Sequence, residues 1–479
     1  MVAGRGATAN RLVPAAKRDE SDYSSASGRS KSEEKSPRTN ANVSRLLIIF
    51  TAAVLPLISA TVVILTVWGI EDAIETSNNE RCVSVESVAW SSSTLVDLVL
   101  QGKPIVVENT PFTTWPCMDW TWPYLQNSVH ADLPVKLSRT AEFKYSTSSK
   151  PYSGSAAATN RVNYSNIVMN AKKLFHRLQN GDSSSYVYAS GEAELLGIPE
   201  DFGDPRDVSF PADMHSDAQI NFWFGSMGVT ADWHYDTSDN LHAMIHGNKT
   251  FHLYPPSAFR QLGLYPSIHH FYRQAQVPFN ISSRGKLVNG DKYSVTLQAD
   301  QALYIPPYWF HSVQTHVASM SVNAWSQSEA FLTMEKIYQL PIALESDWPR
   351  CKLLYGAWLF VDEVLHKTLS DERAVFLAHT LASRYKLVKY SNADENEHCL
   401  ALKQCAADAR MNQLVPAEEL DIFKSAVTSR VADHVMLFLS MARDVRAINL
   451  GNFVEHLYSM VLGVDHQEYM PCLLGLAWQ

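Results

Sequence analysis

An uncharged stretch of 25 residues, Leu46 to Ile70, constrains this chain more than any other feature. It reads LLIIFTAAVLPLISATVVILTVWGI and is bounded by Arg45 and Glu71. A helix of this length rises about 37 Å, enough to cross the apolar part of a bilayer with some tilt. Buried helices of soluble proteins rarely run so far without a charge, and a cleaved signal peptide has an apolar region of only about 7 to 15 residues. Residues 46–70 are therefore predicted to be a transmembrane signal anchor.

The segment before this anchor, residues 1–45, is rich in Ser, Lys, Arg and Glu and poor in large apolar side chains, which predicts a disordered tail. It carries nine Lys and Arg residues against five Asp and Glu, whereas residues 71–81 carry four acidic residues and one arginine. The positive-inside tendency puts the tail in the cytoplasm. The chain is then expected to be a single-pass, type II membrane protein of the endoplasmic reticulum or Golgi, with its catalytic domain in the lumen.

Charge and cysteine content argue against several classes of protein. The formal net charge is −9, and no basic stripe follows residue 45, so no nucleic-acid partner is expected. The six cysteines include no CxxC pair, which indicates neither a zinc finger nor a thioredoxin motif. Disulfide bonds are possible, but the sequence does not determine their pairing, because six cysteines allow about 15 complete pairings.

Two patterns divide the rest of the chain. Between residues 82 and 326, short runs rich in β-branched and aromatic residues, such as QINFWFG and ALYIPP, are separated by Pro, Gly and Asn. Many short strands with few long helices are typical of a β-sandwich or barrel. Over residues 327–479, apolar residues recur at three- and four-residue spacing, which predicts a helical C-terminal region. Its helices are expected to pack on the barrel or to form a homodimer.

The densest group of possible metal ligands lies in ADWHYDTSDN, where His234 and Asp236 stand two residues apart. On a strand, this spacing directs both side chains to one face. His311, in YIPPYWFHSV, follows at the end of another strand-like run. Two imidazoles and a carboxylate on one face leave metal positions open, the arrangement used for iron(II) and oxygen chemistry, although zinc or manganese accept the same ligands. His234, Asp236 and His311 are therefore the predicted catalytic metal ligands.

Taken in order, these segments resemble the JmjC/cupin-like (cupin_8) oxygenases that depend on iron(II) and 2-oxoglutarate, and among them the asparaginyl hydroxylase that inhibits hypoxia-inducible factor. The resemblance begins at PIVVENTPFTTWPCMDW, continues through NFWFGSMGVTADWHYDTSDN, and ends with ADQALYIPPYWFHSV and SVNAW. It implies a catalytic domain over residues 82–326 that folds as a double-stranded β-helix, a jelly-roll barrel. It also implies Fe(II) and 2-oxoglutarate as cofactors.

The same resemblance implies four contacts near the cosubstrate. Lys249, in HGNKTFHLYPP, matches the lysine that pairs with the far carboxylate of 2-oxoglutarate, since a dianion inside a barrel needs a buried cation at that end. Thr230 resembles the hydroxyl that shares this carboxylate, but it stands four residues before His234 where the family usually has three. Asn240 and Asn323 match polar residues beside the cosubstrate and the metal. The remaining histidines of these strands match no ligand position and are predicted to be structural: His242, His246, His252 and His316.

The function implied is hydroxylation of a protein side chain in the secretory pathway. Two other functions are compatible with the same fold: a catalytically inactive, membrane-tethered cupin scaffold, and a JmjC-type lysyl demethylase. A metal-dependent cupin enzyme that does not use 2-oxoglutarate is a further alternative, and Lys249 is the feature that argues against it.

Overall fold

The computed structural model describes residues 80–146, 163–181, 184–209, 218–279, 288, 290–385, 397–462 and 470–474. The predicted tail (1–45) and signal anchor (46–70) lie outside these residues, so both stay predictions. Among the residues that are described, no helix combines the length and apolar character needed to cross a membrane. All of them belong to one compact unit, Ser77–Gln479.

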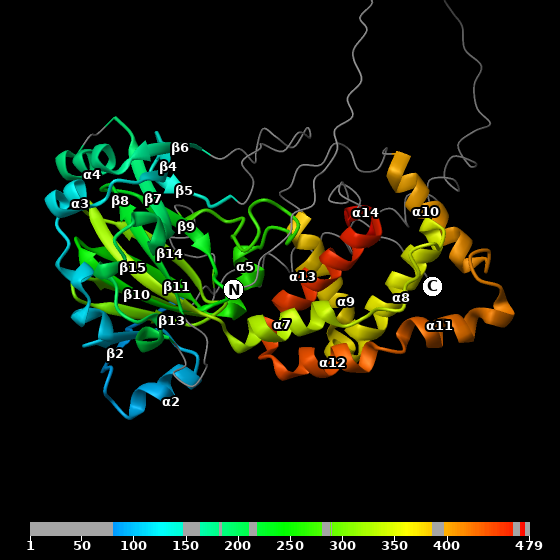
Figure 1. Ribbon diagram of the computed structural model, residues 1–479. Coiled ribbons are helices and arrows are strands. Elements are labelled where there is room, and N and C mark those ends of the chain that lie inside the picture. Colours follow the sequence, from blue (N-terminus) through cyan, green and yellow to red (C-terminus); the bar gives the residue numbers. More distant parts are fainter. Residues whose placement is uncertain are drawn as a thin grey trace, which may run out of the picture. The chain divides into compact units, whose positions relative to one another are not determined.

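Two β-sheets form the first part of this unit (Figure 1). The six-stranded sheet has the order β1 (Glu80–Val83), β12 (Gly290–Leu297), β11 (Lys249–Tyr254), β14 (Phe310–Thr315), β9 (Thr230–His234) and β5 (Glu142–Phe143). The nine-stranded sheet has the order β2 (Glu86–Ala89), β3 (Ile105–Glu108), β13 (Ala302–Ile305), β10 (Asp239–His246), β15 (Ser319–Ser326), β8 (Gln219–Gly225), β7 (Tyr186–Glu192), β4 (Asp132–Ser138) and β6 (Tyr164–Asn170).

The two sheets face each other across an apolar cluster. Met244 and Leu303 enter it from the nine-stranded sheet, and Phe251 and Leu253 enter it from the six-stranded sheet. This arrangement buries one face of each sheet, as expected when two sheets stack to form a core. The prediction of a mainly β, cupin-like fold is confirmed.

The outer face of the nine-stranded sheet is covered by α3 (Trp122–Ser128) and α4 (Ala171–Asn180), while α2 (Thr94–Leu100) lies near β2. Strand β8 shows the resulting alternation. Phe222 and Phe224 point outward into the cluster with these helices, and the ring centres of Phe224 and Phe175 are 5.1 Å apart. Asn221 and Trp223, the alternate residues, line a cavity on the inner side.

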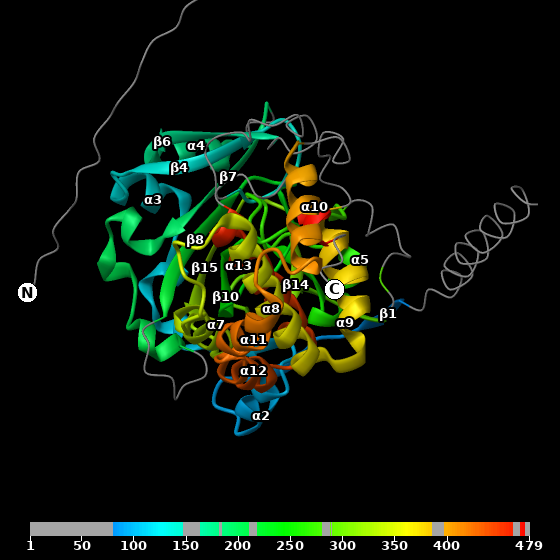
Figure 2. The same ribbon diagram turned by 90° about the vertical axis from the view of Figure 1, so that its right-hand side faces the viewer.

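The C-terminal region is helical, as predicted, and its helices gather on one side of the sheets (Figures 1 and 2). The main helices are α7 (Glu329–Gln339), α8 (Arg350–Leu369), α10 (Glu397–Arg410), α11 (Leu420–Thr428), α12 (Val431–Ser440) and α13 (Arg443–Leu462), with the short α9 (Arg373–Val375) and α14 (Met470–Leu474). They share one apolar core with the barrel, in which Tyr235 and Phe310 join Phe360 and Phe453. The short α5 (Phe259–Leu262) comes earlier in the chain, between β11 and β12.

Two disulfides cross-link these helices. Cys351 on α8 pairs with Cys405 on α10, and Cys399 on α10 pairs with Cys472 on α14. The other two cysteines are free: Cys82 is exposed and Cys117 is buried. The structure thus pairs four of the six cysteines, a pattern outside the complete pairings counted from the sequence.

Candidate metal centre

His234, Asp236 and His311 converge at one end of the paired strands β9 and β14. His234 and His311 are direct partners in the antiparallel register, and their ring centres are 4.1 Å apart. Asp236 Oδ2 lies 3.6 Å from His311 Nε2, and one ligand atom from each residue falls within 4.8 Å of the others. Among the described residues this is the one group of three or more His, Cys, Asp and Glu side chains close enough to hold a metal ion.

The route by which Asp236 reaches the centre differs from the alternation of a strand. Strand β9 ends at His234, so Asp236 is carried by the turn that follows. Its carbonyl oxygen accepts a hydrogen bond of 2.7 Å from the Tyr308 amide, which ties this turn to the start of β14. The two-residue spacing does bring both side chains into one cluster, but a backbone contact rather than strand geometry positions the second one.

Both imidazoles are oriented by backbone carbonyls two residues earlier. His234 Nδ1 lies 2.7 Å from the Asp232 carbonyl oxygen, and His311 Nδ1 lies 3.0 Å from that of Trp309. A ring that donates through Nδ1 keeps its Nε2 lone pair for a metal. Burial, aided by the adjacent His234, lowers the pKa of His311 to about 4, so this ring is neutral near pH 7.

A chain of side-chain amides leads to the carboxylate of the centre. Trp223 Nε1 donates to Asn323 Oδ1 at 2.7 Å, Asn323 Nδ2 donates to Asn240 Oδ1 at 2.9 Å, and Asn240 Nδ2 reaches Asp236 Oδ2 at 3.3 Å. Asn240 lines the cavity, whereas Asn323 is fully buried behind it. The two predicted asparagines therefore come together, with Asn240 beside the ligand and Asn323 fixing its amide.

Lys249 is buried in the same cavity. It begins β11 directly after the turn at Gly247, whose φ of 78° is favourable for glycine. Its Nζ donates to Ser321 Oγ at 2.6 Å, and among the described residues no carboxylate pairs with it. Burial lowers the pKa of Lys249 to about 7. A buried lysine in such surroundings is expected where the protein binds an anionic ligand.

His242, which the sequence indicated to be structural, also lines the cavity. It is 6% exposed, and its Nε2 is buried without a hydrogen-bond partner in the described part of the chain. Burial, and after it the charge of Lys249, lowers the pKa of His242 well below the usual value, so the ring is neutral. A buried, unsatisfied ring nitrogen beside a buried ammonium favours a polar ligand at this position.

The position of Thr230 does not fit the predicted contact. Its side chain is buried, its hydroxyl lies 3.5 Å from the Gly228 carbonyl oxygen, and it is not part of the cavity wall. The next residue, Ala231, lines the cavity instead. The register of β9 with β14 shifts between His311 and Val313, and the extra residue noted before His234 accompanies this irregularity.

The cavity has a volume of about 630 Å³, which is in the range of small-molecule binding sites. Its walls include residues that the sequence reasoning did not identify: Lys136, Tyr188, Trp223, Arg273 and Gln274. Lys136 alternates along β4 with the buried Leu133 and Val135, a pattern that reads as a solvent-facing lysine. The pairing of Lys136 with Tyr188, which also lines the cavity, shows that this face of β4 is turned toward the site.

The segment Leu264–Gln276, here called the outer loop, forms the wall beside β9. The amide of Ala275 donates to the carbonyl oxygen of Trp233, and the amide of Tyr235 donates to the carbonyl oxygen of Arg273, both at 3.0 Å. His269 and His270 stack on each other with ring centres 4.2 Å apart and do not line the cavity.

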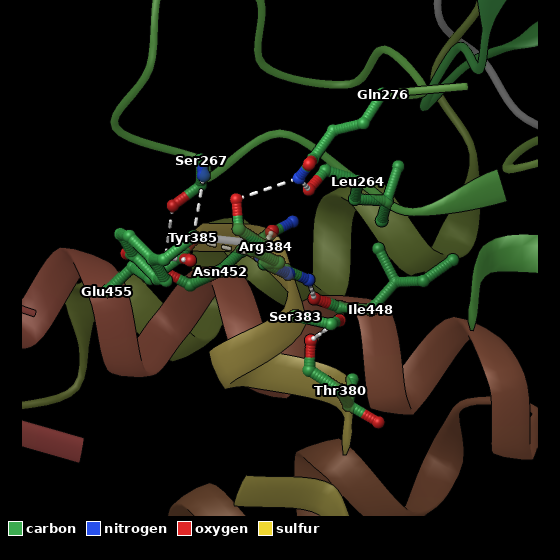
Figure 3. A network of polar contacts seen from close by, with 10 residues as sticks. All are labelled: Leu264, Ser267, Gln276, Thr380, Ser383, Arg384, Tyr385, Ile448, Asn452 and Glu455. Carbon is green, nitrogen blue, oxygen red and sulfur yellow. Dashed lines mark hydrogen bonds and ion pairs between the residues drawn. The ribbon is translucent and has the colours of Figure 1, made fainter. Parts of the chain in front are cut away.

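Residues of the C-terminal helical region form hydrogen bonds with the outer loop (Figure 3). The Ser267 amide donates to Glu455 Oε2 at 2.7 Å, and the Gln276 side chain donates to the Arg384 carbonyl oxygen at 2.7 Å. Arg384 and Glu455 form an ion pair of 2.9 Å with side chains 1% and 0% exposed, and Tyr385 donates to Glu455 at 3.0 Å. The helical region is thus connected by hydrogen bonds to a wall of the candidate site.

Comparison with known proteins places this architecture in a family. Residues 91–330, half of the chain, match the family of cupin-like domains, and the chain belongs to that family. The resemblance to JmjC/cupin oxygenases is confirmed at this level, while the closer resemblance to the asparaginyl hydroxylase stays a prediction.

Similar curated proteins have different activities. The chain is 32% identical over 136 residues to lysine-specific demethylase JMJ31 of Arabidopsis thaliana, covering 27% of this chain and 25% of the relative. It is 24% identical over 241 residues to tRNA wybutosine-synthesizing protein 4 of Aspergillus oryzae, covering 48% and 22%. It is 26% identical over 132 residues to the human bifunctional peptidase and (3S)-lysyl hydroxylase JMJD7, covering 23% and 42%. The chain therefore spans less than half of each of these relatives.

Proposed function

We propose that this protein is an iron(II)- and 2-oxoglutarate-dependent oxygenase that hydroxylates a protein side chain. The observation that carries the proposal is the placement of three candidate metal ligands in one cavity with a buried lysine that has no carboxylate partner among the described residues. The reaction would consume 2-oxoglutarate and oxygen, convert a C–H bond of the substrate to C–OH, and release succinate and carbon dioxide.

The ligand set fits iron(II). His234, Asp236 and His311 would hold the ion with two imidazole nitrogens and one carboxylate, a set that leaves coordination positions open for a cosubstrate. Zinc and manganese accept these ligands too, so the choice of iron rests on the cosubstrate site beside them. When bound, Fe(II) with 2-oxoglutarate and oxygen supplies the oxidising power that no protein side chain has.

The polar groups beyond the metal ligands fit 2-oxoglutarate. Lys249 would pair with its far carboxylate, and the buried Nε2 of the neutral His242, which has no partner among the described residues, would hydrogen-bond to the same ligand in the tautomer that carries its proton there. Asn240 keeps the Asp236 carboxylate in place through its amide. Thr230, the fourth predicted contact, is not proposed as a ligand because it lies outside the cavity wall.

Protein substrates and a luminal site are part of the proposal. The human relative is named a lysyl hydroxylase, which supports a side chain as the target. The two disulfides support residence of the catalytic domain in the secretory lumen, behind the predicted anchor at 46–70, because such bonds persist in oxidising compartments. Homodimerisation through the C-terminal helices stays a prediction.

Demethylation of a methylated lysine is the second candidate, and the name of the Arabidopsis relative favours it. Both reactions begin with hydroxylation of a C–H bond, so the metal and cosubstrate residues would have the same roles. The inactive scaffold is the third candidate. The presence of all three candidate metal ligands together with the buried Lys249 argues against it.

Succinate formation tests the proposal. The full-length chain with Fe(II), ascorbate, oxygen and 2-oxoglutarate should form succinate, and His234→Ala should abolish this. Lys249→Met and His242→Phe should each weaken 2-oxoglutarate binding by about tenfold or more, since each removes a hydrogen bond to a charged group. His252→Phe, a histidine outside the cavity wall, is the matched control. Equal cosubstrate affinity in all of these variants would contradict the assignment.

A further inference from the structure

The cavity contains a cation that neither the metal nor the proposed cosubstrate explains. Lys136 projects from β4 with its Nζ 5.4 Å from the ring centre of Tyr145 and 5.8 Å from that of Tyr188. Within the described part of the chain, no carboxylate forms an ion pair with it. The ammonium lies close to two aromatic rings, and the described residues give it no counter-charge.

The acidic side chains that line the same cavity have other partners. Asp232 Oδ2 lies 3.5 Å from Lys144 Nζ, and its Oδ1 accepts a hydrogen bond of 2.8 Å from the Phe279 amide. Asp236 belongs to the metal centre, and Glu192 accepts a hydrogen bond of 3.3 Å from Gln219. Among the described residues, no carboxylate of this cavity is therefore available to pair with Lys136, and a ligand could supply the counter-charge.

Lys136 and Lys249 occupy different parts of the site. Lys249 Nζ bonds to Ser321 on β15, whereas Lys136 belongs to β4, which is separated from β15 by β8 and β7. Three steps across a sheet amount to about 14 Å. Tyr188, the register partner of Lys136, lines the same cavity as Asp236. A group held by Lys136 would thus lie on the Tyr188 side of the metal centre.

The chemistry of this position favours a carboxylate. A single ammonium with three donors matches one monoanionic group, whereas sites for phosphate dianions usually combine several cations or the fork of an arginine. Burial lowers the pKa of Lys136 to about 8, and a bound anion would stabilise the charged form. The surrounding rings would contact the apolar part of the ligand.

We infer that Lys136 selects an acidic protein segment, in which an aspartyl or glutamyl carboxylate pairs with its ammonium beside the metal centre. This inference rests on the proposed oxygenase function and specifies its substrate class. Lys136 is a specificity-determining residue in this account, and the metal and cosubstrate sites do not depend on it.

Peptide binding tests the inference. The full-length protein would be loaded with Fe(II) and 2-oxoglutarate without oxygen and titrated with four pentapeptides that differ only in a central Asp, Asn, Lys or phosphoserine. We expect the Asp peptide to bind about tenfold more tightly than the Asn peptide, and Lys136→Met to remove this difference. Lys136→Glu should reverse the preference toward a peptide with central Lys. Lys173→Met, on the exposed side of α4, should change nothing.

Several outcomes would overturn the inference. One is equal affinity of the Asp and Asn peptides, including no binding of either, and another is a preference for the phosphoserine peptide that requires Lys136. A loss of 2-oxoglutarate affinity in Lys136→Met as large as that in Lys249→Met would assign Lys136 to the cosubstrate instead. Failure of the proposed function is recognised separately, because the wild-type protein would then bind neither Fe(II) nor 2-oxoglutarate.

Discussion

At the scale of single residues, Asp239 shows how burial makes stability depend on pH. Its carboxyl group is 6% exposed and accepts a hydrogen bond of 2.6 Å from the Tyr304 hydroxyl. Burial raises its pKa from the usual 3.8 to about 6. The folded state therefore holds the proton more tightly than the unfolded state, so the contribution to stability is present below pH 3.8 and is lost as the pH rises through about 6.

Asp239→Asn keeps an acceptor for Tyr304 without the charge. It should raise the free energy of unfolding near pH 7.5 by up to about 3 kcal/mol and reduce the fall in stability between about pH 4 and 7. Urea unfolding at both ends of this range measures the effect, with the exposed Asp97→Asn as the control. An unchanged pH profile would show that Asp239 titrates normally in the folded protein.

Individual residues also mark how far the sequence could predict the site. The order of His234, Asp236, Lys249 and His311 along the chain was sufficient to propose them, because the family's motifs hold these types at fixed places. His242 was interpreted as structural, since nothing local shows that its Nε2 lacks a partner. Thr230, whose spacing to His234 already departs from that of the family, lies outside the cavity wall at the irregularity between β9 and β14.

At the scale of elements, the buried pair of Arg384 and Glu455 connects α13 to the outer loop. Arg384→Met would leave Glu455 charged and unpaired in the interior, at a cost of about 3 to 5 kcal/mol. We expect a lower melting temperature and faster hydrogen exchange of the amides at Ser267, Ala275 and Gln276. The exposed pair of Arg443 and Glu372 offers the control, because Arg443→Met should alter neither property.

A result in which Arg384→Met lowers the melting temperature but leaves exchange in the outer loop unchanged would contradict this connection. The double variant Arg384→Met with Glu455→Leu should recover part of the stability, since it removes the unpaired charge. It should not restore protection of the Ser267 amide, which loses its acceptor.

The strands and helices themselves were largely predictable in kind. The β-rich runs of residues 82–326 and the helical spacing after 327 reappear in the structure. The outer loop was not foreseen as part of the site, because its place depends on pairing with β9 and on contacts nearly 190 residues away, such as Ser267 with Glu455. Such long-range contacts leave no periodicity in the local sequence.

At the scale of the whole molecule, the disulfides test the proposed compartment. Peptide mapping of protein taken from its native cells, without reduction, should find Cys351 bonded to Cys405 and Cys399 bonded to Cys472, with Cys82 and Cys117 free. Because each bond closes a long loop, reduction should lower the melting temperature of the helical region. Six free thiols in such material would contradict a luminal location.

The central claim is that one cavity holds both a metal ion and 2-oxoglutarate. Fe(II) and then 2-oxoglutarate would be added to the full-length protein without oxygen, and the visible charge-transfer absorption of a 2-oxo acid chelating Fe(II) would be recorded. This absorption should appear in the wild-type protein, require a higher 2-oxoglutarate concentration in Lys249→Met, and be absent in His234→Ala. A folded wild-type protein that binds neither Fe(II) nor 2-oxoglutarate would contradict the account and leave the scaffold as the better explanation of the fold.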